Sequence, residues 1–238
     1  MKIESVAGLY RDPPVVHQRG TRAYPLAIEV ASYLSDLVGP RSRTLETGCG
    51  LSTALFAMRG CLHVCITPDH DEVTRMLAYL RDRDIDASGV TYLVGRSQHI
   101  LPGVDLDGLD VVLIDGQHAF PMPFIDWYYC ASMLRVGGML VLDDTQLWTG
   151  RVLRQVLGDD SGWDLVRDFF GRTACFRKSS SFTDVEWWGQ QPYVVRRSRY
   201  GRFAENVRHG ISVIAPWRLR RGQSLRVPKP RPRCSWPL

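Results

Sequence analysis

The stretch from Thr44 to Thr53 joins a short apolar strand to a helix through a glycine turn. The strand carries Glu46 near its end, Gly48-Cys49-Gly50 follows, and the helix is expected to begin at Ser52 or Thr53. Glycine permits a tight turn and lets a ligand approach the backbone closely. The free N–H groups at the helix start then face that ligand. In an α/β sheet, such a turn binds a nucleotide-like cofactor at the carboxyl end of the first strand.

Strands and helices alternate along most of the chain. Strands are expected at 43–47, 63–67, 90–94, 110–114 and 139–142, with helices at 26–37, 52–58, 72–81, 98–101, 123–134 and 151–157. This alternation predicts an α/β fold with a Rossmann-like, doubly wound sheet. Two further strands, 163–169 and 173–177, are joined at Gly171-Arg172 and predict a hairpin. The sheet is therefore expected to have seven strands, mostly parallel, with a C-terminal antiparallel hairpin.

Composition predicts three parts of the chain. Residues 1–24 form an N-terminal arm that is irregular to about residue 21, residues 25–189 form the cofactor-binding domain, and residues 190–238 form a basic, partly disordered tail with one helix near 201–210. Of the 30 Lys and Arg residues, 12 lie in 195–238, where Glu205 is the only acid. Such a tail is expected to be a solvated extension, and binding to nucleic acid or to an anionic membrane are the alternatives.

The rest of the composition points to a cytoplasmic protein. No run of about 18 apolar residues is present, and no apolar segment of a signal peptide follows Met1. The six cysteines are scattered, with a spacing typical of neither a disulfide framework nor a zinc site.

Two later strands end in acids. Asp115 follows the apolar run 111–114 and is succeeded by Gly116-Gln117-His118, and the strand at 139–142 is followed by Asp143 and Asp144. The carboxyl ends of parallel strands meet at one sheet edge, so the three carboxylates are expected to converge and repel one another. Mg²⁺ or another divalent cation would relieve that repulsion. The alternative is that Asp143 or Asp144 caps a turn while Asp115 holds loop backbone.

Three segments together resemble the class I S-adenosylmethionine-dependent methyltransferases. They are Glu46-Thr47-Gly48-Cys49-Gly50, Ile114-Asp115-Gly116-Gln117-His118, and the run from Gly137 to Asp144. The chain is most similar to the small-molecule O-methyltransferases of the macrolide-sugar and cephalosporin-hydroxylase-like group, over about residues 25 to 178. The resemblance implies that 25–189 is a methyltransferase domain that binds S-adenosylmethionine.

The same resemblance assigns cofactor-binding residues. It places Glu46, Gly48 and Gly50 around the methionine part. Ser52, at the helix start, and Asp115 belong to the same expected cofactor site. The family often has an acid for the ribose at the end of the second strand, where this chain has Thr67, with Asp69 two residues later. Either could serve, although Asp69 is more simply a helix N-cap. Near adenine, Arg96 could stack and Ser97 could bond the ring or cap a helix.

Metal-dependent relatives bind their ion through acids that match Asp115, Asp143 and Asp144. Several of them have a base three residues after the first acid, which is His118 here. An imidazole can take the proton of a hydroxyl near neutral pH, so His118 and Asp115 are the expected catalytic residues; the alternative for His118 is a structural bond to loop backbone. Nearby aromatic residues could form an acceptor pocket or pack in the core: Phe120, Phe124, Trp127, Tyr128, Tyr129 and Trp148.

These expectations describe a methyltransferase that O-methylates a hydroxyl of a small molecule or sugar, with assistance from a divalent cation. One alternative is an RNA methyltransferase anchored by the basic tail, and another is a non-catalytic binding module that has kept the fold. A dehydrogenase is less well supported, because Thr53 stands where Gly-x-Gly-x-x-Gly needs its third glycine. Assembly into a homo-oligomer is left open.

Overall fold

The structure, a computed structural model, describes residues 3–17, 25–185 and 187–199. The chain divides into two compact units, Met1–Val195 and Arg196–Leu238, and every element described below lies in the first. Most of the basic tail, including the helix expected near 201–210, lies outside the described residues.

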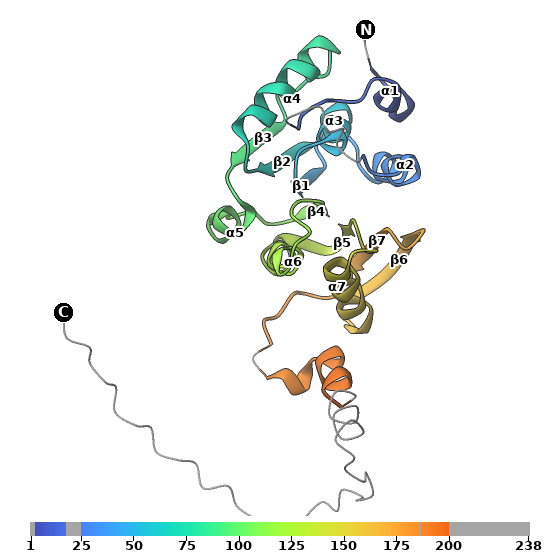
Figure 1. Cartoon of the computed structure of the whole chain (residues 1–238), viewed down its shortest axis with the longest axis vertical. Coiled ribbons are helices and arrows are strands. Elements are labelled where there is room, and N and C mark those ends of the chain that lie inside the picture. The colour runs from blue at the N-terminus through green and yellow to red at the C-terminus, as the bar shows by residue number, and fades with distance from the viewer. Residues whose placement is uncertain (1–2, 18–24, 186, 200–238) are drawn as a thin grey trace, which may run out of the picture. The chain divides into compact units, whose positions relative to one another are not determined.

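One seven-stranded sheet forms the centre of the first unit (Figure 1). Its strands are β1 (Arg43–Thr47), β2 (Leu62–Thr67), β3 (Val90–Val94), β4 (Leu109–Ile114), β5 (Leu134–Leu142), β6 (Trp163–Phe169) and β7 (Thr173–Lys178). The order across the sheet is β3-β2-β1-β4-β5-β7-β6. Strands β1 to β5 run parallel, β7 is antiparallel to β5, and β6 pairs antiparallel with β7. The predicted seven-stranded Rossmann-like fold with a C-terminal hairpin is confirmed.

Helices cover both faces of the sheet. On one face, α2 (Ile28–Leu37), α3 (Leu51–Met58) and α4 (His70–Asp82) pack against alternate strand residues such as Cys65, Val111 and Val141. On the other face, α6 (Met122–Met133), α7 (Trp148–Asp159) and the turns α5 (Ser97–Ile100) and η2 (Leu101–Gly103) cover Leu45, Val112 and Leu140. Because both faces are buried, β4 is apolar without interruption from Val111 to Ile114, and the polar residues Thr44 and Glu46 of β1 are buried as well.

The glycine pair Gly137-Gly138 has a different role from the expected one. The sequence predicts that it ends a helix over 123–134, but α6 ends at Met133 and β5 begins at once with Leu134. Both glycines lie inside β5, beside a register shift against Leu109 and Val111 of β4. A Cβ on Gly138 would lie 2.9 Å from the carbonyl oxygen of Arg135. The glycines therefore permit a bulge in β5.

The N-terminal arm also contains regular structure. Helix α1 (Val6–Arg11) begins at Ser5, whose side chain accepts a hydrogen bond from the N–H of Gly8. Leu9 is fully buried against the face covered by α2 to α4. This helix gives a weak signal in the sequence because it is only six residues long and Leu9 is its one buried residue.

Membrane-spanning segments were also sought. Among the described residues, none of the helices combines the length and apolar character needed to cross a bilayer.

Candidate active site

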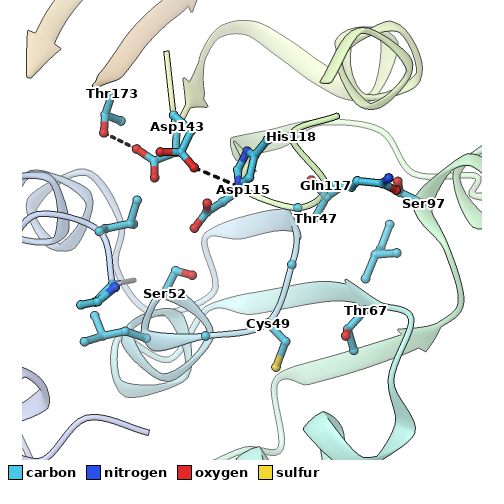
Figure 2. Close-up of a pocket in the computed structure, with 18 of the residues that line it drawn as sticks. Thr47, Cys49, Ser52, Thr67, Ser97, Asp115, Gln117, His118, Asp143 and Thr173 are labelled. Carbon is cyan, nitrogen blue, oxygen red and sulfur yellow. Dashed lines mark hydrogen bonds and ion pairs between the residues drawn. The ribbon is translucent and has the colours of Figure 1, made fainter. Parts of the chain in front are cut away.

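The carboxyl ends of β1, β2, β4 and β5 surround a cavity of about 750 Å³, a volume suited to a small-molecule ligand. It lies at the point where the strand order reverses between β1 and β4, which is where open α/β sheets bind ligands. Most of the residues predicted for the site line this cavity (Figure 2): Gly48, Gly50, Ser52, Thr67, Arg96, Ser97, Asp115, His118, Asp143 and Asp144. Glu46 and Asp69 are not among the lining residues.

Gly48 brings the first turn into direct contact with the turn after β4. Its φ is +106°, and a Cβ at this position would lie 2.5 Å from the backbone oxygen of Asp115. The N–H of Gly48 donates to the carbonyl of Ile66, 2.9 Å away, which joins the turn to β2 as well. Only glycine fits here. The close approach fixes the bottom of the cavity.

Glu46 supports the turn from behind instead of facing the cavity. Its carboxylate is buried and accepts hydrogen bonds from Ser52 Oγ at 2.5 Å and from Thr53 Oγ1. His63 Nε2 lies 3.1 Å from the same carboxylate, and His63 Nδ1 lies 2.8 Å from Thr44 Oγ1. The cofactor contact of Glu46 stays a prediction, and in this structure its carboxylate belongs to a buried network that fixes the start of α3.

The network makes Glu46→Gln a destabilising change. In glutamine, an NH₂ group, which only donates, replaces one of the two accepting oxygens of Glu46. At least one of the buried donors around this position therefore loses its acceptor. We expect the free energy of unfolding to fall by about 2 kcal/mol in urea denaturation. Glu29→Gln, on the exposed side of α2, is the control and should change nothing measurable. A Glu46→Gln variant as stable as wild type would show that the network contributes little.

The end of β2 presents a carboxylate that sequence reasoning missed. Asp69 accepts from the N–H of Asp71 and caps α4, which confirms the capping alternative. Glu72, one turn into the helix, lines the cavity instead. Thr67 Oγ1 donates to Glu72 Oε2 at 2.5 Å, and His17 Nδ1 lies 2.5 Å from Glu72 Oε1. His17 also lines the cavity, so the N-terminal arm contributes to its wall.

The contact between His17 and Glu72 should make stability depend on pH. The hydrogen bond to Glu72 raises the pKa of His17, against the opposing effect of burial. A raised histidine pKa means that the stabilisation is complete below about pH 6.5, the unfolded value, and is lost as pH rises through the folded-state value. We expect an effect of at most about 1 kcal/mol, since His17 is partly exposed. Urea unfolding of wild type and Glu72→Gln across this range measures it, and parallel curves would contradict it.

Three carboxylates meet on the opposite wall. Burial, together with the negative charges of Asp143, Glu46 and Asp144, holds the pKa of Asp115 well above its ordinary value. Burial is also the main reason why the pKa of Asp143 is raised, although Thr173 donates to its Oδ1. Concentrated negative charge of this kind favours a positively charged ligand in the cavity.

Two of the predicted metal ligands, Asp143 and Asp144, are engaged with other side chains. Asp143 is bonded to Thr173 (Figure 2). Asp144 lies next to His118 and accepts a hydrogen bond from Gln146. Within the described ranges, no group of three or more His, Cys, Asp or Glu side chains is placed to hold a metal ion. Mg²⁺ at Asp115, Asp143 and Asp144 therefore stays a prediction, and no step below depends on it.

His118 and Asp144 form a pair at the cavity. His118 Nε2 lies 3.0 Å from Asp144 Oδ2, and both side chains are about one-third exposed. Asp144 has a φ of +54°, and α7 packs closely against it. A Cβ on Gly150 would lie 2.7 Å from the Asp144 carbonyl oxygen. The backbone thus fixes Asp144, and the contact found for His118 in the described part of the chain is with this side chain rather than with loop backbone.

The adenine-side residues are placed less specifically. Arg96 is exposed at the cavity, and Ser97 is the first residue of α5 rather than its cap. Residues at the β6–β7 turn also line the cavity, and the sequence analysis did not anticipate them: Phe169, Phe170, Arg172 and Thr173. Their signal in the sequence was only the hairpin itself, because pairing with β5 is what brings β7 to the cavity.

Comparison with known proteins bears on this fold and site. Residues 45–145 match a family model, Methyltransf_24, described as a methyltransferase domain. No curated protein matches the chain significantly.

Solved structures share the fold. Rv0187 from MTB, titled as cofactor-bound, superposes with a TM-score of 0.56 at 19% identity, covering 66% of this chain and 83% of its own. The O-methyltransferase TomG from Streptomyces achromogenes, in complex with SAM, gives 0.53 at 19%, covering 66% and 82%. An rRNA methylase from Streptococcus thermophilus gives 0.51 at 15%, covering 66% and 99%.

The sheet order and the glycine turn define the chain as a class I, Rossmann-like methyltransferase fold. With the family match over 45–145, the chain is an S-adenosylmethionine-dependent methyltransferase. The cavity fits that cofactor, because it combines a close backbone approach at Gly48 with acids that favour its positive charges.

Proposed function

We propose that the protein O-methylates a hydroxyl group of a small molecule, with His118 as the general base. The observation that carries this proposal is the pair formed by His118 Nε2 and Asp144 Oδ2 at 3.0 Å, at the cavity that also contains Asp115. A carboxylate beside Nε2 favours the tautomer that carries its proton there. Nδ1 is then left as the acceptor for the proton of the substrate.

The bound cofactor supplies an electrophilic methyl group on a sulfonium. Proton transfer from the substrate hydroxyl to His118 Nδ1 would leave its oxygen free to bond to the methyl carbon. The carbon–sulfur bond would break at the same time, and S-adenosylhomocysteine would be the leaving group. Asp144 orients the imidazole and stabilises the imidazolium that results. Gly48 and the Glu46 network keep the cavity wall in place, so that positioning contributes to the rate.

Two alternatives are separated from this proposal by experiment. One alternative acceptor is RNA, because one of the structural neighbours is an rRNA methylase. At 15% identity, this similarity shows a shared fold and not a shared substrate. Divalent-metal assistance, predicted from Asp115, Asp143 and Asp144, is the other. We would measure transfer of labelled methyl from S-adenosylmethionine to a panel of hydroxylated small molecules and to RNA, with Mg²⁺ and with EDTA.

The outcomes separate the hypotheses cleanly. Methyl transfer to small molecules that continues in EDTA supports the proposal as stated. Methyl transfer that stops in EDTA supports the predicted assistance by a divalent metal ion. Label only in RNA, with a steep salt dependence, would favour the RNA methyltransferase. If labelled cofactor binds but no acceptor is methylated, the non-catalytic binding module gains support.

A further inference from the structure

Three aromatic side chains near the cavity are exposed to an unusual degree. Phe120, Trp148 and Phe170, called here the aromatic rim, are 67%, 60% and 78% exposed. Large aromatic side chains contribute strongly to stability when buried, and a cluster of exposed ones is typical of a binding surface. The core does not use these three side chains, although it does use Phe124, Trp127 and Tyr129 nearby.

Two residues of the aromatic rim follow closely after the proposed catalytic pair in the sequence. Phe120 follows His118 by two residues, and Trp148 begins α7, four residues after Asp144. Their ring centroids are 6.1 Å apart and the rings are tilted by 57°. The two rings therefore form adjoining walls of one apolar corner rather than a closed stack.

Phe170 belongs to the same region through a third segment. It lines the cavity from the β6–β7 turn, and the turn is bonded to the loop after β5: the N–H of Thr145 donates to Arg172 O at 2.8 Å, and Thr145 Oγ1 donates to Gly171 O at 2.9 Å. Phe170 has a φ of +57°, a conformation that is unfavourable for a bulky residue. Folding alone would favour Asn or Gly at this position, so the phenylalanine is better explained by what it contacts.

An imidazole base also limits which kind of hydroxyl group can serve as the methyl acceptor. A phenolic hydroxyl ionises near pH ~10, whereas a water-like aliphatic hydroxyl ionises nearer ~16. A single imidazole can assist the first far more effectively than the second. Flat apolar rings also pack well against a corner formed by two aromatic rings.

We infer that the aromatic rim binds the acceptor as a flat aromatic ring and presents its phenolic hydroxyl to His118. This inference rests on the proposed function and narrows its acceptor from hydroxylated small molecules in general to phenols.

Naphthol and its saturated counterpart decahydronaphthol provide matched probes, since they share a carbon skeleton and differ in flatness and acidity. Each would be titrated by calorimetry into the full chain saturated with S-adenosylhomocysteine, and methyl transfer to each would be followed with labelled S-adenosylmethionine. We expect naphthol alone to be methylated and to bind at least about tenfold more tightly.

Phe170→Asn is the decisive variant. Asn tolerates a positive φ, so the melting temperature should not fall, while the affinity for naphthol should drop about tenfold. Trp148→Ala should weaken naphthol similarly, and Trp148→Phe should restore most of the affinity. Trp187→Ala is the control, because Trp187 is 63% exposed but belongs to none of the three segments that carry the aromatic rim.

Each failure has a distinct signature. If S-adenosylhomocysteine does not bind wild type, the proposed function itself fails. If it binds normally but both alcohols bind alike, or Trp187→Ala weakens naphthol as much as Trp148→Ala, the aromatic rim is not an acceptor site. If the rim variants instead convert a dimer into a monomer on size-exclusion chromatography and leave naphthol binding unchanged, the rim is an interface between copies of the chain.

Discussion

Replacing Gly48 with alanine is expected to abolish cofactor binding and to destabilise the protein by about 3 kcal/mol. The new Cβ would lie 2.5 Å from the backbone oxygen of Asp115, at a φ of +106°. Neither partner can move freely, since the N–H of Gly48 is bonded to Ile66 and that of Asp115 to Thr47. Urea denaturation and calorimetric titration with S-adenosylhomocysteine measure the two effects.

Two other glycines serve as controls for this prediction. A Cβ on Gly50 or on Gly39 would meet nothing within 4 Å, so both alanine variants should fold as wild type does. Gly50 lines the cavity, and its alanine variant should bind the cofactor more weakly because the methyl group takes ligand space. Gly39→Ala should bind normally. Normal stability and binding in Gly48→Ala would show that the turn can relax.

Replacing His118 with glutamine is expected to lower kcat for methyl transfer by about 10²- to 10⁴-fold. The affinity for S-adenosylhomocysteine should stay within about twofold of wild type, since the proposed role lies in the chemical step. Asp144→Asn should lower kcat in the same direction but less, because it leaves the base in place and alters only its orientation. Single-turnover methyl transfer to the acceptor found in the panel gives the rate of the chemical step for both variants, and calorimetry gives their affinity for S-adenosylhomocysteine.

The control for the base is an exposed histidine elsewhere. His99 lies on α5 and does not line the cavity, so His99→Gln should leave kcat unchanged. If His118→Gln retains wild-type kcat, proton removal is not limiting or another group performs it. If cofactor affinity falls as far as kcat, His118 supports the cavity rather than the chemistry.

The strands of the fold were predictable because their signals are local. Short runs rich in apolar residues, separated by glycine and acids, predicted β1, β3 and β6 with the correct bounds and β2, β4 and β7 to within one residue. Strand β5 was placed five residues too late because Gly137-Gly138 looks the same in sequence whether it ends a helix or permits a bulge. Only pairing with β4 decides between these two.

The site was predictable where residues follow a strand directly, as Asp115, His118 and Asp144 do. The role of a side chain was harder to predict where it can point either into the cavity or into the protein interior. Glu46 precedes the turn by one residue, and its buried network with His63 depends on the pairing of β1 with β2. Glu72 was overlooked because its partner His17 lies 55 residues away in the sequence, and nothing local marks such a contact.

The buried support of the first turn also bears on how the enzyme finishes its cycle. Because Glu46 fixes the start of α3 from behind and Gly48 is held against Asp115, this part of the cavity keeps one shape whatever occupies it. S-adenosylmethionine and its demethylated product differ by one methyl group and one positive charge, so we expect a rigid wall to bind both. We therefore expect the demethylated product to inhibit turnover, and the loss of positive charge near Asp115, Asp143 and Asp144 to favour release of the product over retention of the donor.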